Sequence, residues 1–126
     1  MAIWAIKGYD EFYGGLHGMI RYEIFEGTEE EAEALGLEMS YEVINEYGDI
    51  VDALEDDVKD QCEWEDIDYD ESGEEVDNIR DEVYGEDTAW DIHQLNKNKL
   101  PTLDFNKLED MFYNNPDEFL EKYAIN

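Results

Sequence analysis

Apolar residues follow two different spacings along this chain, and these spacings predict its strands and helices. The segment AIWAIKGY (2–9) is rich in β-branched and aromatic residues, and MIRYEIFEG (19–27) alternates apolar with polar positions. Both patterns are typical of β-strands. The glycine-rich segment DEFYGGLHG (10–18) lies between them. We therefore expect an antiparallel hairpin with a long tip.

The segment after this hairpin has the start signal of a helix. Thr28 and Glu31 have the spacing of a capping box, in which the hydroxyl and the carboxylate each accept a hydrogen bond from a backbone amide that the helix leaves unpaired. Apolar residues then recur every three or four positions. Gly48 is expected to end this helix, since glycine favours the conformation that follows a helix.

Further apolar spacings predict four more helices. Gly85 is expected to end one of them. Asn115 is expected to start the last, because Pro116 and Glu118 follow it in the order typical of a helix start. The expected ranges are 49–62, 74–85, 104–115 and 115–125.

The segment TAWDIHQLN (88–96) alternates at Trp90 and Ile92, which favours a third strand near residues 88–95. The pattern as a whole predicts an α+β fold: a small antiparallel sheet covered on one face by four to five helices. We expect one domain over residues 1–126. Its single core would contain Trp4, Ile6, Ile20, Tyr22, Leu35, Met39, Val43, Leu54, Val58, Trp90, Phe112 and Phe119.

Negative charge is concentrated in the middle of the chain. The formal net charge is −29, and residues 29–87 hold 26 acids and two bases. This exceeds the charge that a small domain needs for solubility. Such a field attracts basic partners and opposes direct contact with nucleic acid or an anionic membrane. The 17 aromatic residues indicate a folded frame, not a solvated acidic tail.

The stretch EWEDIDYDESGEEVD (63–77) is the most acidic part and contains no base. It has three interpretations: a solvated face, a metal loop, or an imitation of a phosphate backbone. Duplex DNA carries one charge per roughly 1.7 Å of its axis, and an α-helix rises about 1.5 Å per residue, so closely spaced carboxylates approach that density. The residues predicted to bind a partner are Glu63, Glu65, Asp66, Asp68, Asp70, Glu71, Glu74, Glu75 and Asp77.

Tyr13 joins this predicted partner-binding set. It lies with Tyr9 and Phe12 in the first loop, where the aromatic residues either cover the sheet or anchor a partner as interface hot spots.

A calcium loop is the alternative reading of the same stretch. Asp68, Asp70, Ser72 and Gly73 match its first half, but Ile79 stands where the bidentate glutamate belongs. We assign no metal ligands and keep a calcium-responsive module as an alternative.

No catalytic residues are assigned either. The chain has two histidines, His17 and His93, and it lacks the common hydrolase, phosphate-loop and dinucleotide motifs. We therefore expect a protein that is not an enzyme and that has no cofactor. An enzyme would need a pocket containing one of the histidines.

In size, in the acidic segment 29–87 and in its lack of catalytic motifs, the chain resembles the small acidic DNA-mimic inhibitors of phages and mobile elements, of the anti-restriction and anti-CRISPR type. The resemblance is one of class and composition over about half the chain. It implies a non-enzymatic inhibitor that occludes the basic groove of a nuclease, a CRISPR effector or another DNA- or RNA-binding protein. An immunity protein that neutralises a basic toxin would use the same electrostatics.

The remaining expectations concern location and assembly. Cys62 is the single cysteine, and the chain shows neither a signal peptide nor a membrane-spanning run, so we expect a cytoplasmic protein. An exposed strand edge would permit a homodimer.

Overall fold

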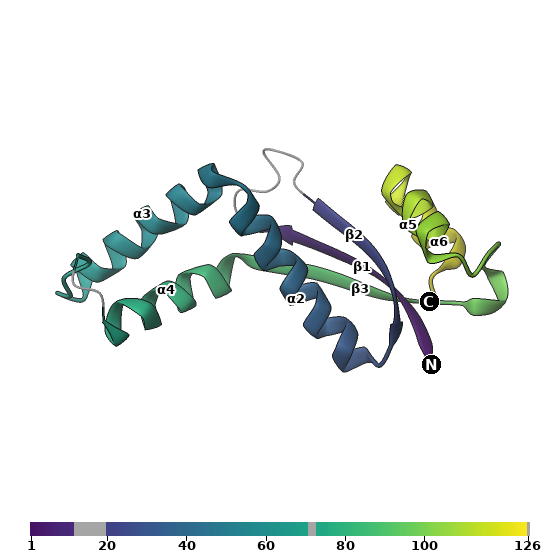
Figure 1. Cartoon of the computed structure of the whole chain (residues 1–126), viewed down its shortest axis with the longest axis horizontal. Helices are drawn as coiled ribbons and strands as arrows, with labels where there is room; N and C mark the ends of the chain where they lie inside the picture. Colours follow the sequence, from purple (N-terminus) through teal and green to yellow (C-terminus); the bar gives the residue numbers. More distant parts are fainter. Residues whose placement is uncertain (12–19, 71–72, 126) are drawn as a thin grey trace.

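The computed structural model describes residues 1–11, 20–70 and 73–125. Its fold is α+β, with a three-stranded antiparallel sheet and five α-helices in these residues (Figure 1). In chain order the elements are β1 (Ala2–Asp10), β2 (Ile20–Gly27), α2 (Glu29–Glu46), α3 (Gly48–Trp64), α4 (Glu74–Asp87), β3 (Thr88–Leu95), the 3-10 helix η1 (Lys97–Lys99), α5 (Phe105–Asn114) and α6 (Pro116–Tyr123).

The sheet has the order β2-β1-β3, so β1 is central and pairs with an antiparallel neighbour on each side. Trp4 lies opposite Phe25 of β2 and Gln94 of β3. The predicted antiparallel pairing of the first two strands and the predicted third strand are both confirmed. Near its end, β3 also forms an isolated bridge between Leu95 and Ala124, which ties the C-terminal segment to the sheet.

Helices cover both faces of the sheet, so the expectation of one covered face is wrong. Ile3 and Ala5 of β1 pack in a cluster with Phe112 of α5 and with α6. Trp4 and Ile6 point to the opposite face, where they pack against α2. The reason is visible in β1 itself: the run AIWAI is apolar at consecutive positions, which is typical of a strand that is buried on both faces.

Small residues bring α2 close to the sheet. Ala32, Gly36 and Ser40 recur every four residues on its buried face. A Cβ atom on Gly36 would lie 2.5 Å from Cδ1 of Trp90, so only glycine fits there. Ser40 joins two strands, because its Oγ donates to the carbonyl of Tyr9 (2.6 Å) and accepts from the amide of Ala89 (3.0 Å).

The helices α3 and α4 extend away from the sheet as an antiparallel pair, and we call residues 48–87 the arm (Figure 1). Two apolar clusters hold it together. Ile44 of α2 packs with Ile50 and Leu54 at the base. Val58, Cys62, Val76 and Ile79 form the distal cluster between the two helices, together with half-buried neighbours.

The predicted single core is therefore wrong: among the described residues, burial falls into four clusters, two on the sheet and two in the arm. Eight of the predicted core residues are buried, and four are only half-buried, namely Ile20, Tyr22, Leu35 and Trp90.

The predicted helix starts are confirmed. The first helix ends just before Gly48, close to the predicted stop, but Gly48 does not form the expected cap, and the predicted stop at Gly85 is wrong. Thr28 and Glu31 make both bonds of the capping box, and the side chain of Asn115 accepts from the amide of Glu118. Gly48 is the first residue of α3, since the extended backbone of Tyr47 ends α2 and starts α3. Gly85 lies inside α4, which continues to the buried Asp87.

Substituting alanine at two helical glycines tests the close packing of α2. Gly36→Ala should destabilise the fold by about 1–3 kcal/mol, because the added methyl group overlaps the Trp90 ring. Gly85→Ala is the matched control, since its Cβ atom would approach only the Tyr41 hydroxyl at 3.9 Å. That change should stabilise the fold by about 0.5–1 kcal/mol. Urea denaturation measures both, and equal effects of the two changes would contradict this packing.

Candidate functional site: the acidic arm

The predicted partner-binding carboxylates lie at the far end of the arm (Figure 1). Glu63 is in the last turn of α3, and Glu74, Glu75 and Asp77 are in the first turns of α4. The connection between the helices holds the others. Each of the eight that the structure describes is exposed. Glu71 and Tyr13 lie outside the described residues. We call the described eight, Glu63, Glu65, Asp66, Asp68, Asp70, Glu74, Glu75 and Asp77, the acidic tip.

A Schellman motif fixes the chain at the end of α3. The amide of Ile67 donates to the carbonyl of Cys62 (2.8 Å), and the amide of Asp66 donates to that of Glu63 (3.2 Å). Asp66 has a φ of 58°, the left-handed conformation that this motif requires. Ile67 then packs against the distal cluster. The tip carboxylates around it are therefore attached to an ordered turn.

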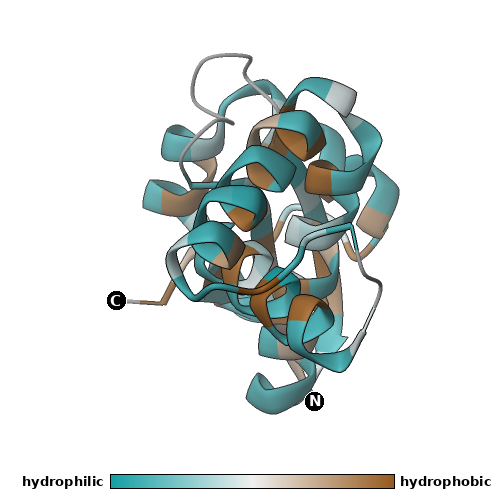
Figure 2. Ribbon diagram, turned by 90° about the vertical axis from the view of Figure 1, so that its left-hand side faces the viewer, coloured by the Kyte–Doolittle hydropathy of each residue, from teal (hydrophilic) through white to brown (hydrophobic). Residues whose placement is uncertain are grey.

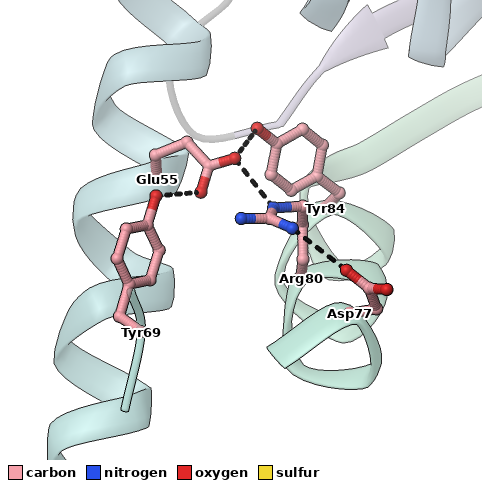
Figure 3. Close-up of polar contacts among 5 residues, drawn as sticks. All are labelled: Glu55, Tyr69, Asp77, Arg80 and Tyr84. Carbon is pink, nitrogen blue, oxygen red and sulfur yellow. Dashed lines mark hydrogen bonds and ion pairs between the residues drawn. The ribbon is translucent and has the colours of Figure 1, made fainter. Parts of the chain in front are cut away.

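Glu55 organises the polar side of the arm (Figure 3). Its two carboxylate oxygens accept hydrogen bonds from the Tyr69 hydroxyl (3.0 Å), Arg80 Nε (2.9 Å) and the Tyr84 hydroxyl (3.1 Å). Arg80 also reaches Asp77 at 3.3 Å. These bonds connect α3, the tip segment and α4 through one carboxylate.

The pKa values in this network follow from its geometry. Partial burial raises the pKa of Glu55, but the hydrogen bonds from Arg80, Tyr69 and Tyr84 outweigh it and the net shift is downward. Burial, followed by the nearby Glu55 charge, raises the pKa of Tyr84 to about 12. Glu55 is therefore held as an anion and Tyr84 as a neutral donor at physiological pH.

The two bases of the acidic segment are both held close to Tyr69. The ammonium of Lys59 lies 5.1 Å from the centre of the Tyr69 ring, and the guanidinium of Arg80 lies 6.0 Å from it. These distances are within the range of cation–π contacts. The positive charges of residues 29–87 are thus gathered on one side of the arm, and the rest of its surface carries carboxylates.

The density of exposed carboxylates along the arm approaches that of duplex DNA. With 17 residues, α3 is about 25 Å long, and a duplex of that length carries about 15 charges. Hydrophilic residues dominate the helices nearest the viewer when the molecule is seen from the arm side (Figure 2). The two helices expose twelve carboxylates: Asp49, Asp52, Asp56, Asp57, Asp60, Glu63, Glu74, Glu75, Asp77, Asp81, Glu82 and Glu86.

Part of this charge is placed where it opposes helix stability. The C-terminal end of a helix carries partial negative charge and favours basic residues. None of the helices α2, α3 and α4 has a base in its last turn, and Glu63, Glu65 and Asp66 surround the end of α3. Helix stability therefore does not explain the charge at the end of α3, whereas Glu74, Glu75 and Asp77 suit the N-terminal end of α4.

Trp64 is a feature of the site that the sequence reasoning missed. It is 86% exposed, although it is the last residue of α3 and lies within the acidic stretch. A usable signal was the phase of the helix. Ile50, Leu54, Val58 and Cys62 define the buried face at intervals of four, and position 64 is about 200° away from Cys62.

The calcium and histidine alternatives gain no support from the arrangement of side chains. In the described residues, no group of three or more His, Cys, Asp or Glu side chains has the geometry of a metal site. Ile79, at the position of the bidentate ligand, is buried in the distal cluster. Asp68 Oδ1 accepts from the amide of Asp70 (3.0 Å). His93 is an exposed residue of β3, and His17 lies outside the described residues.

No family model, curated protein or solved structure matches this chain. Its chemistry must therefore be inferred from its own residues. Within the described ranges, no helix is both long enough and apolar enough to cross a membrane.

Removing the Glu55 charge should weaken the arm in a pH-dependent way. Glu55→Gln should cost about 1–3 kcal/mol at pH 7, because it replaces hydrogen bonds to a charged acceptor. The folded pKa of Glu55 is lowered, so its contribution is present above the unfolded value of about 4.3 and is lost as pH falls through the folded value. The difference from wild type should therefore shrink toward pH 3 in urea denaturation. Asp56→Asn, which removes a charge at an exposed neighbour outside this network, is the control and should cost little at pH 7. A pH-independent difference for Glu55→Gln would contradict this role.

Calcium should bind weakly, if at all, because Ile79 cannot supply two oxygen ligands. We expect no change in circular dichroism at about 1 mM Ca²⁺, the range of weak extracellular sites. A micromolar site that survives excess Mg²⁺ would instead support the calcium-responsive module.

Proposed function

We propose that this protein is a non-enzymatic inhibitor that imitates nucleic acid and occludes the basic groove of a nuclease or another DNA- or RNA-binding protein. The arm of α3 and α4 is the part that enters the groove. Its exposed carboxylates meet the lysines and arginines that otherwise contact phosphates.

The observation that carries this proposal is the arm itself: a projecting helix pair with twelve exposed carboxylates over about 25 Å. Its charge is fixed in space by apolar clusters and by the Glu55 network. A fixed array loses less conformational entropy on binding than a disordered acidic tail would. It also steers basic partners toward it by its field.

Neutralising the acidic tip tests the proposal. The variant Asp66→Asn, Asp68→Asn, Asp70→Asn removes three charges and should keep the fold, since asparagine tolerates the left-handed conformation of Asp66 and can retain the Asp68 oxygen. Its melting temperature should rise, because charge repulsion falls. Inhibition should weaken, and its dependence on salt should become shallower.

The assay measures inhibition of purified restriction, RNA-guided and non-specific nucleases over a series of salt concentrations. The matched control is Asp110→Asn, Asp117→Asn, Glu121→Gln, which removes three exposed charges outside the arm and should inhibit like wild type. Excess duplex DNA or guide RNA should compete with the protein for its target. The proposal fails if none of these nucleases is inhibited, or if the tip variant inhibits as strongly as wild type. Binding that nucleic acid never displaces would instead favour an immunity protein.

A further inference from the structure

A groove runs along the arm beside Trp64. Leu54, Asp57, Asp60, Gln61 and Trp64 of α3 line one side, and Val83 and Glu86 of α4 line the other, around a volume of about 430 Å³. The half-buried Val83 supplies apolar surface, the buried Leu54 lies beneath it, and carboxylates and the exposed indole surround it.

The groove is separate from the Glu55 network. At about 100° per residue, positions 57, 61 and 64 lie on the side of α3 opposite to Glu55. Lys59 and Arg80 lie on the Tyr69 side, so no base of the acidic segment lines the groove. The groove therefore places an exposed aromatic ring beside carboxylates, with no base among its lining residues.

This combination has a specific chemical complement. An arginine side chain offers a flat guanidinium that stacks on an aromatic face, pairs with carboxylates and has an apolar stem. A lysine ammonium is more strongly hydrated and has no plane to stack. An exposed tryptophan is also a frequent hot spot at protein interfaces.

We infer that this groove binds an arginine-bearing basic segment of the partner, with one guanidinium stacked on Trp64 and paired with Asp60, which lies one helical turn before it. The apolar part of the segment lies over Val83. This inference rests on the proposed function, because it names the part of a basic partner that the arm holds. It also gives Trp64 a role that the carboxylates of the tip cannot fill.

Peptides of equal charge separate this role from general attraction. Nona-arginine and nona-lysine are titrated into the full-length protein by calorimetry at about 0.15 M salt, where the screening length is about 8 Å. Wild type should bind nona-arginine more tightly. Trp64→Leu keeps an apolar side chain but removes the ring, and should weaken arginine binding about 2- to 30-fold and lysine binding by a smaller factor. Trp64→Phe should retain most of the preference.

Tyr113→Leu is the control, because Tyr113 is another exposed aromatic residue (67%) and lies on α5, outside the arm. It should bind both peptides like wild type. Equal affinity of wild type for the two peptides, or arginine binding that Trp64→Leu leaves unchanged, would overturn the inference. If either result is found while the tip variant still loses nuclease inhibition, the inferred arginine binding in the groove is wrong and the proposed function stands. If the arginine preference holds but no nuclease is inhibited, the groove stands and the proposed function fails.

Discussion

The apolar contact between α3 and α4 is the constraint on which the rest of this structure depends. The two helices and their connection carry most of the acidic side chains of a chain with net charge −29, so they repel each other along their length. Ile50, Leu54, Val58 and Cys62 on α3 meet Val76, Ile79 and Val83 on α4 and offset that repulsion. The Glu55 carboxylate adds directional bonds on one side, where it gathers the donors of both helices. The other carboxylates of the described arm, apart from the buried Asp87, then face water, so most of the charge lies on the surface.

The arm is attached at its base, where the chain enters it from α2 and leaves it into β3. Tyr47 turns the chain directly from α2 into α3, and α4 leads into β3 at Thr88. The amide of Glu11 donates to the carbonyl of Asp87 (3.0 Å), which fixes the end of α4 to the sheet side of the molecule. Because the small residues of α2 hold it close to β1 and β3, the base of the arm is set by the same packing that forms the core. Packing against the sheet therefore sets the direction in which the arm projects. The carboxylates of α3 and α4 set the charge that it presents.

Local signals in the sequence predicted local structure well. The Thr28–Glu31 and Asn115–Glu118 pairs set helix starts because their side chains bond to amides within the same turn, and such contacts need no information about the rest of the fold. The two glycines did not act as expected, because whether a helix ends at a glycine depends on contacts made by the residues beyond it. Gly85 permits a helix to end, but the chain continues to Asp87, which is buried against the sheet. The covered second face, the projection of the arm and the groove beside Trp64 depend on contacts between distant segments. Hydrophobic spacing along one helix or strand shows which of its faces is buried. It does not show which other helix or strand packs against that face.

The arm is an insertion between α2 and β3, and its length is independent of the sheet. The β1–β2 and β1–β3 pairings are made by residues outside the arm, and the described part of the arm contains no strand. One additional turn in each of α3 and α4 would move the end of the arm outward by about 5.4 Å and leave every strand register unchanged. The length of the arm can therefore be changed without altering the sheet. This requires paired insertions of three or four residues in α3 and α4, which preserve the alignment of the two apolar faces.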